Sequence, residues 1–182
     1  MKKAMIFGFG LMLSMISLAQ EKYMTRTGTV YFKSNAEIED GVEATNKSAA
    51  CVLNTDNGEI VFQVAMKAFR FEKALMEEHY NENYLETTQF PKSSLRGSIV
   101  NYSKDLLDGK AHEITIEGEF NLHGVTKMIS EKGTIQMIDR QIVLKSHFLV
   151  PLEDYKIAIP KMVQDKIAKD IDVDLDMILD KV

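Results

Sequence analysis

The chain has 182 residues, with 22 Lys or Arg against 27 Asp or Glu, and its formal net charge is −5 at pH 7. Proteins that bind nucleic acid present clustered basic residues to the phosphate backbone, whereas the basic residues here are outnumbered and dispersed. Nucleic acid is therefore excluded as a partner. The length suits one domain, and the single cysteine, Cys51, rules out an internal disulfide.

The N-terminal segment has the pattern of a secretory signal peptide. Two lysines precede an apolar run over residues 4–18, and the small residues Ser17 and Ala19 stand before a cleavage point. Because the run is short for a membrane-spanning helix, a cleaved leader over residues 1–19 is favoured over an uncleaved anchor. We expect a mature domain of residues 20–182 with 20 basic and 27 acidic residues, a net charge of −7, in the periplasm or outside the cell.

Cys51 lies in an apolar stretch, between Ala50 and Val52. We interpret it as a buried small residue rather than a reactive thiol, because free cysteine packs like a small hydrophobe. Without a disulfide, the stability of the domain must come from its core and its β-structure.

Apolar and polar residues alternate in several segments, as is typical of strands with one buried face. The alternation occurs in residues 60–66, 95–99, 113–117, 142–148 and 171–177. Turn signals between the strands suit hairpins of an antiparallel meander. These signals are Asn57-Gly58, Asp108-Gly109 and Lys132-Gly133.

Two segments break this alternation, and we predict short helices near the ends of the fold for both. They are residues 71–82 and residues 160–168, the second beginning at Pro160. Many amphipathic strands with short connections leave unpaired edges unless the sheet closes on itself. The predicted fold is therefore all-β, an antiparallel barrel of about eight strands with one or two short helices.

The last strand carries the aspartates Asp172, Asp174 and Asp176 on one face, which raises the question of a calcium site. A calcium-binding EF-hand loop needs a glycine at its turn and a distal glutamate, and the segment has neither. We therefore predict a solvated acidic face.

A polar cluster around His79 is the first candidate for chemistry. His79 and Glu82, three residues apart, could supply two metal ligands, with His123 as a third from a distant segment. A zincin helix would need a second histidine four residues from the first, which is absent. The favoured alternative is that Glu78, His79, Asn81 and Asn83 hydrogen-bond the loop backbone and each other at the barrel mouth.

The second candidate is His123, followed by Gly124, which indicates a tight turn or strand bend. His123 could act as a general base, but no nucleophile signature accompanies it. A structural role is favoured. We predict no catalytic residue, no resident metal and no cofactor, and we do not expect an enzyme.

The apolar residues on one face of the predicted strands are predicted to line the barrel interior. The apolar residues of the connecting segment 69–76 are predicted to join them. A barrel of this size either fills with such side chains or keeps room for one ligand. The eleven methionines, some of them in the leader, suit a pliable lining. The predicted lining residues are Phe62, Val64, Met66, Phe69, Phe71, Leu75, Met76, Ile116, Phe120, Leu122, Met137, Leu144 and Phe148.

Together these segments resemble the YceI-like family. The matching stretches are residues 69–87 with Phe90-Pro91, residues 95–99, 118–127, 146–148 and 154–160. The chain departs from the family pattern at Asn121-Leu122, and it matches weakly up to Asn54.

The resemblance implies a lipocalin-like barrel with a long apolar channel, of the kind found in exported bacterial proteins that bind a polyisoprenoid chain. It implies binding, transport or storage of such a lipid or a related amphiphile, with transient membrane contact. A polar mouth of His79, Asn81, Asn83 and His123 is then expected to hold the head group. Two other functions stay open: a metal-binding or enzymatic barrel using His79 and His123, and a ligand-free interaction module that could form a homodimer.

Overall fold

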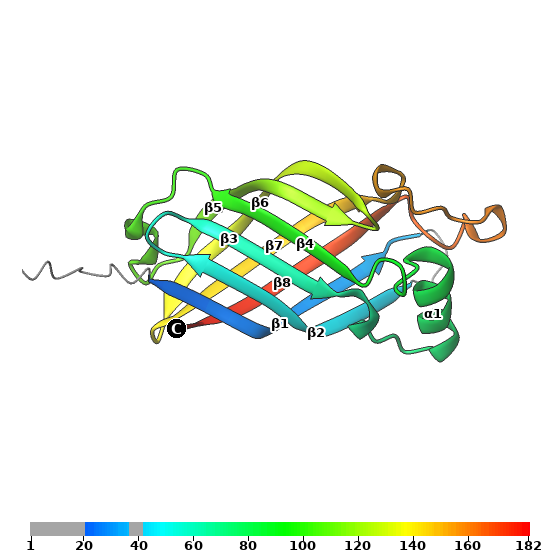
Figure 1. The fold of residues 1–182 in the computed structure, drawn as a ribbon, viewed down its shortest axis with the longest axis horizontal. Helices are drawn as coiled ribbons and strands as arrows, with labels where there is room; N and C mark the ends of the chain where they lie inside the picture. The colour runs from blue at the N-terminus through cyan, green and yellow to red at the C-terminus, as the bar shows by residue number, and fades with distance from the viewer. Residues whose placement is uncertain (1–20, 37–41) are drawn as a thin grey trace, which may run out of the picture.

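The protein is a closed barrel of eight antiparallel strands, seen in a computed structural model that describes residues 21–36 and 42–182. Each strand pairs with the next in sequence, and the last closes on the first (Figure 1). The predicted signal peptide lies outside the described residues. The all-β antiparallel barrel is confirmed. The strands are β1 (Lys22–Ser34), β2 (Glu43–Asn54), β3 (Glu59–Ala65), β4 (Lys92–Ile99), β5 (His112–Leu122), β6 (Val125–Ile138), β7 (Gln141–Pro151) and β8 (Asp170–Lys181).

The last strand shows how the sequence alternation sets the two faces of the wall. Ile171 and Met177 are buried inside the barrel, while the aspartates between them lie on its outer side. All three carboxylates meet side chains of the neighbouring strand β7. His147 Nδ1 lies 2.9 Å from Asp174 Oδ1 and its Nε2 lies 3.3 Å from Asp172 Oδ1, while Lys145 Nζ lies 3.2 Å from Asp176 Oδ2.

Two hairpins are closed by two-residue turns with positive φ. In the β5–β6 turn, His123 has φ 49° and Gly124 has φ 73°, which matches the twist of the flanking strands. The β6–β7 turn uses Asp139 and Arg140, at φ 49° and 68°. The turn predicted at Lys132-Gly133 is wrong, because both residues lie within β6.

Helical structure is limited to short segments. The helix predicted over residues 71–82 is present as α1 (Ala74–His79), which continues into one π-helical turn, η2 (Tyr80–Tyr84). The helix predicted over residues 160–168 is wrong: only a 3₁₀ turn, η5 (Lys161–Val163), forms there, and Met162 is 94% exposed. An isolated helix needs a buried apolar face, which this segment does not have. In the part of the chain that the structure describes, no helix has the length and apolar character to cross a membrane.

One half of the barrel is filled by aliphatic side chains. Six large side chains there are fully buried, and they come from five different strands. This packing occupies the end opposite α1, where the β2–β3 and β6–β7 turns lie (Figure 1). The six residues are Leu53, Ile60, Ile135, Ile142, Met177 and Leu179.

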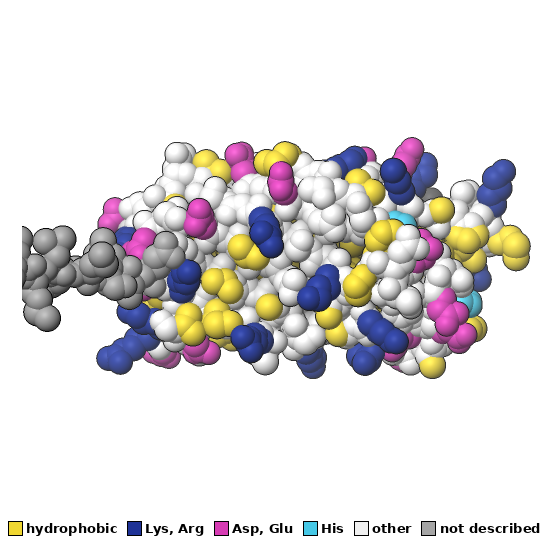
Figure 2. Space-filling view, in the orientation of Figure 1, with side chains coloured by type: hydrophobic (Ala, Val, Ile, Leu, Met, Phe, Trp, Pro, Cys, Tyr) yellow, Lys and Arg dark blue, Asp and Glu magenta, His cyan; other side chains and the backbone are white. Residues whose placement is uncertain are grey.

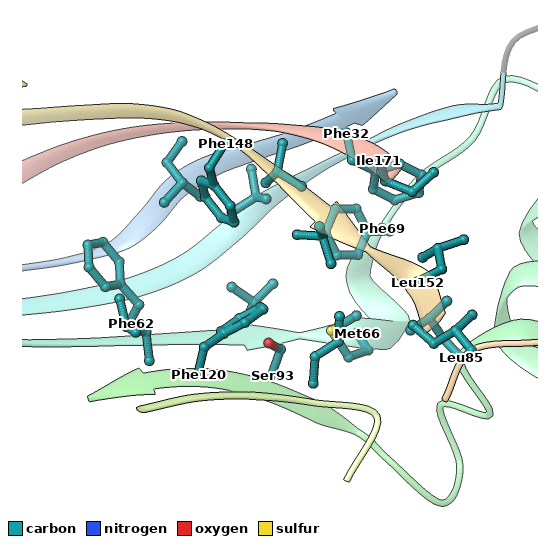
Figure 3. Close-up of a pocket in the computed structure, with 18 of the residues that line it drawn as sticks. Phe32, Phe62, Met66, Phe69, Leu85, Ser93, Phe120, Phe148, Leu152 and Ile171 are labelled. Carbon is teal, nitrogen blue, oxygen red and sulfur yellow. The ribbon is translucent and has the colours of Figure 1, made fainter. Parts of the chain in front are cut away.

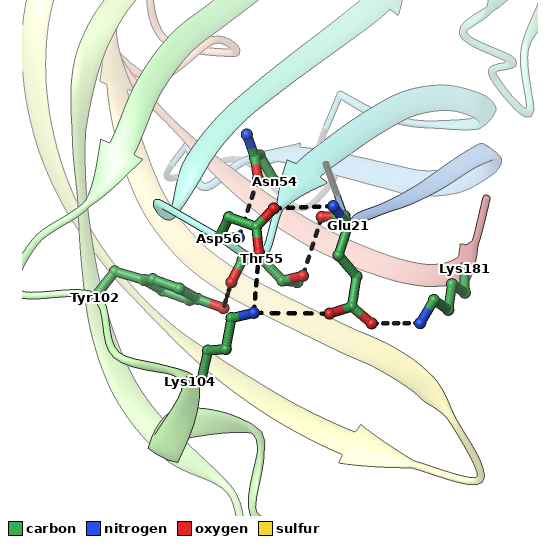
Figure 4. A network of polar contacts seen from close by, with 7 residues as sticks. All are labelled: Glu21, Asn54, Thr55, Asp56, Tyr102, Lys104 and Lys181. Atoms are coloured by element: carbon green, nitrogen blue, oxygen red, sulfur yellow. Dashed lines mark hydrogen bonds and ion pairs between the residues drawn. The ribbon is translucent and has the colours of Figure 1, made fainter. Parts of the chain in front are cut away.

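A polar network covers the filled end (Figure 4). Lys104, in the 3₁₀ turn η3 (Lys104–Leu107), lies 2.9 Å from Asp56 Oδ1 and 3.8 Å from Glu21 Oε2. Lys181 of β8 forms a further ion pair with Glu21. The Tyr102 hydroxyl donates a hydrogen bond of 3.1 Å to the Thr55 carbonyl. The network joins the two ends of the barrel chain to the β2–β3 turn and the β4–β5 loop.

Candidate functional site

The other half of the barrel, beside α1, contains a cavity of about 190 Å³. Figure 3 shows Phe62 of β3, Phe120 of β5 and Phe148 of β7 directed into it from different sides of the wall. Nearer the mouth, the lining includes Leu85, Leu152 and other apolar residues of the connecting segments. The inward-facing residues of the strands and the apolar residues of the connecting segments together form an apolar chamber.

Nine of the thirteen residues predicted to line the barrel interior line this cavity. They are Phe62, Val64, Met66, Phe69, Met76, Ile116, Phe120, Leu122 and Phe148.

The other four predicted residues lie elsewhere. Leu75 is 61% exposed on α1, and Phe71 packs against the Tyr80 ring outside the cavity lining. Met137 and Leu144 have the inward parity but belong to the filled half, where they neighbour Ile142 and Ile135 across the β6–β7 ladder. Parity gives the face of a strand, whereas the height of a residue along the barrel depends on how the strands are tilted and staggered.

An aromatic cluster stands at the mouth of the cavity. Phe32 stacks on Tyr80 at 5.7 Å between ring centroids, and Phe69 and Phe71 meet the same tyrosine edge-on or tilted, at 5.7 and 5.0 Å. Among the described residues, the Tyr80 hydroxyl is the one buried side-chain polar atom without a hydrogen-bond partner. Burial raises the pKa of Tyr80, so its hydroxyl stays protonated.

A family model described as the YceI-like domain matches residues 20–179. The chain belongs to the YceI-like family. No curated protein matches the chain.

Solved structures share the barrel of this YceI-like chain. A polyisoprenoid-binding domain from Saccharophagus degradans, implicated in plant cell wall breakdown, is 14% identical with a TM-score of 0.77, over 90% of this chain and 100% of that one. BcnA of Burkholderia cenocepacia is 7% identical with a TM-score of 0.70, over 84% and 95% of the two chains. A YceI protein of Campylobacter jejuni is 11% identical with a TM-score of 0.57, over 98% and 97%. At such identities the likeness establishes the shared fold.

In this YceI-like barrel, none of the four residues expected to form a polar mouth lines the cavity. His79 and Asn83 lie on the helical segment outside it. The Asn81 side chain donates to the Glu77 carbonyl at 2.7 Å and accepts from the Thr87 hydroxyl at 2.9 Å, which fixes the π-helical turn. These hydrogen bonds position the segment that carries Tyr80.

His123 joins three segments of the mouth. From the β5–β6 turn, its Nδ1 lies 3.0 Å from the Tyr155 carbonyl of η4 (Leu152–Tyr155), and its Nε2 lies 3.0 Å from Glu86 Oε2. Both partners are acceptors, so both hydrogen bonds form together only when both ring nitrogens carry a proton. Phe90 packs on the ring at 4.4 Å between centroids. The structure thus gives His123 structural contacts at the rim.

The metal site considered for His79, Glu82 and His123 finds no support in this arrangement. Across residues 21–36 and 42–182, no three His, Cys, Asp or Glu side chains are grouped so that they could hold one ion. Cys51 is fully buried, as predicted, and burial raises the pKa of its thiol.

One charged lining residue was missed by the sequence interpretation. Glu131 of β6 lines the cavity, and burial raises the pKa of its carboxyl. The signal was present in the sequence, because Glu131 shares the parity of Ile129 and Ile135. Lys127 lies on the same face of β6, and this second charged residue among apolar ones made the alternation of the strand hard to recognise.

Proposed function

We propose that the protein is an exported binding protein that holds a polyisoprenoid or a similar long-chain amphiphile in its barrel, for transport or storage. The observation that carries the proposal is the apolar cavity of about 190 Å³ between the filled half and the mouth. A dry apolar cavity of about 150 Å³ is enough to bind benzene. Each Å² of apolar ligand surface removed from water contributes about 25 cal/mol.

The serine hydroxyls of the lining support this proposal because three of the four are already engaged by the protein. The Ser93 hydroxyl donates to the Asn121 carbonyl at 2.8 Å, and the Ser146 hydroxyl donates to the Lys132 carbonyl at 2.6 Å. The Ser34 hydroxyl accepts from the Ala168 backbone N–H at 2.7 Å. With these hydroxyls satisfied, a ligand meets mainly apolar surface, which favours binding over catalysis.

Family membership and the structural neighbours support the same ligand class. The Saccharophagus degradans domain, which shares this barrel, is described as polyisoprenoid-binding. Flexible side chains at Met66 and Met76, with Met177 where the filled half meets the cavity, allow the chamber to adapt to a chain longer than the cavity itself. Export rests on the signal-peptide pattern of residues 1–19.

Transient membrane contact is the remaining part of the proposal. The connection from η4 to β8 (residues 156–169) contributes Ile157, Ile159 and Ile167 to the cavity and presents Met162 to solvent. The same connection contains four lysines and one aspartate. It projects beside α1 in Figure 1, and Figure 2 shows basic and apolar side chains at that end of the molecule. An insoluble lipid could enter the barrel directly from a bilayer held against this rim.

The test is mass spectrometry of an organic extract of the purified mature protein, compared between two tryptophan variants of β3. Val64 lines the cavity, so Val64→Trp should fill it and remove the bound lipid. Val61, on the outer face of the same strand, is 40% exposed, so Val61→Trp should leave the lipid in place. Equal lipid content in the two variants, or no lipid in the wild type, would count against the proposal.

A further inference from the structure

The cavity lining carries negative charge and no positive charge among the described residues. No lysine, arginine or histidine of the described chain lines the cavity, and Glu131 is the single charged side chain that does. Glu131 lies on the inner face of β6, opposite Ile116 of β5, which also lines the cavity. A carboxylate therefore faces an apolar chamber that holds no cation to neutralise an anion.

Glu131 lies in a part of β6 that is paired on one side only. The β6–β7 ladder begins at Gly133 and Ser146, so residues 125–132 of β6 pair with β5 alone. Within the described residues, the Glu131 carboxylate has neither an ion pair nor a hydrogen bond. Its charge also contributes to the raised pKa of Tyr155, which burial raises first. This carboxyl is therefore an acceptor that no side chain of residues 21–36 and 42–182 uses.

The Tyr80 hydroxyl is a second unused polar group of the same lining. It is buried and has no partner among the residues that the structure describes, which costs about as much as a lost hydrogen bond unless a ligand supplies the partner. A hydroxyl can donate or accept, whereas an ionised carboxylate only accepts. A ligand group that carries an O–H or N–H and no negative charge can hydrogen-bond with either the Glu131 carboxylate or the Tyr80 hydroxyl.

We propose, resting on the lipid-binding function above, that the cavity selects lipids whose polar group is uncharged and bears an O–H or N–H. Prenyl alcohols and long-chain amides belong to this class. Lipids with a carboxylate or phosphate are disfavoured, because the anion would lose its hydration near Glu131 without gaining a cation.

The inference is tested with two ligands that share one prenyl chain, geranylgeraniol and geranylgeranoic acid. Delipidated protein is loaded with the neutral fluorescent probe N-phenyl-1-naphthylamine, and each ligand displaces it at pH 8, where the free acid is ionised. The alcohol should bind at least about tenfold more tightly than the acid. This comparison uses the wild-type protein and does not depend on the folding of a variant.

Glu131→Gln keeps the size of the side chain and removes its charge, so the preference for the alcohol should shrink by at least about threefold. Glu119→Gln makes the same change on the outer face of β5 and should leave the preference as in the wild type. Equal binding of alcohol and acid to the wild type, or the same preference in both variants, would overturn the inference while leaving lipid binding intact. Failure of the probe itself to bind would overturn the proposed function and the inference together.

Discussion

The hydroxyls of Tyr80 and Tyr102 lie in opposite situations. Tyr102 donates to the Thr55 carbonyl at 3.1 Å, whereas the buried Tyr80 hydroxyl has no partner within the described chain. A buried polar group left unpaired costs about 1–3 kcal/mol, and a paired one contributes about 1 kcal/mol. The same chemical change at the two positions should therefore have opposite effects on stability.

Tyr80→Phe should stabilise the lipid-free protein by about 1 kcal/mol or more, and it should raise the Tm by a few degrees. Tyr102→Phe should lower the Tm by a similar amount. Thermal unfolding of the delipidated proteins measures both. With saturating geranylgeraniol the gain from Tyr80→Phe should disappear, because the wild-type hydroxyl then has a partner. A lower Tm for lipid-free Tyr80→Phe would contradict this account of the hydroxyl.

At the scale of elements, the polar network over the filled end joins segments that lie far apart in sequence. Lys104 and Lys181 hold the pKa of Asp56 and of Glu21, respectively, below the ordinary range for carboxyls. A carboxyl with a lowered pKa stabilises the fold above its unfolded pKa, about 4, and this contribution is lost as the pH falls through the folded value. These ion pairs are solvent-exposed, so salt screens them.

The double variant Lys104→Met, Lys181→Met should therefore lose less Tm than the wild type between pH 7 and pH 3. Lys132→Met, which changes an exposed lysine of β6, serves as the control and should follow the wild type. Salt at 0.5 M should bring the double variant and the wild type closer together at pH 7. An unchanged acid dependence in the double variant would show that the network does not contribute to it.

The strands show what the sequence could and could not predict. The alternation of β3, β5, β7 and β8 is local, so it placed Phe62, Ile116 and Phe148 on the inner face correctly. The alternation could not give the position of a residue along the barrel axis. For this reason Met137 and Leu144, which face inward but lie in the filled half, were expected in the channel. Strands β1 and β2 were not predicted individually, because β1 is irregular: its pairing shifts register around Gly28.

Turn and site predictions depended on how strongly single residues mark a conformation. Glycine marked the β5–β6 turn at Gly124, but it also suggested a turn at Gly133, which lies within a strand. The β6–β7 turn was missed because Asp139 and Arg140 adopt positive φ without a glycine. The polar cluster around His79 was conspicuous in sequence, yet the cavity wall uses Tyr80, the next residue.

At the scale of the whole molecule, the barrel has a sealed end and an open end. Aliphatic packing and the polar network occupy one end, so the proposed ligand would enter beside α1, where residues 156–169 border the cavity. The chain as a whole is acidic, and any attraction to anionic lipid is therefore local to this connection. Lysines near an anionic bilayer contribute about 1 kcal/mol each, and an exposed apolar side chain adds its own insertion energy.

Met162→Glu should weaken co-sedimentation with vesicles that contain 30 mol% phosphatidylglycerol, because it replaces the exposed apolar tip with a like charge. Replacing Lys161 and Lys166 with glutamine should cost about 2 kcal/mol, roughly a thirtyfold loss of binding. Ile178→Glu introduces the same charge at a half-exposed site near the sealed end of β8, so it should bind vesicles as the wild type does. Equal losses in Met162→Glu and Ile178→Glu would mean that net charge alone governs adsorption. If the wild type does not bind these vesicles, the lipid must reach the barrel by a route other than direct docking.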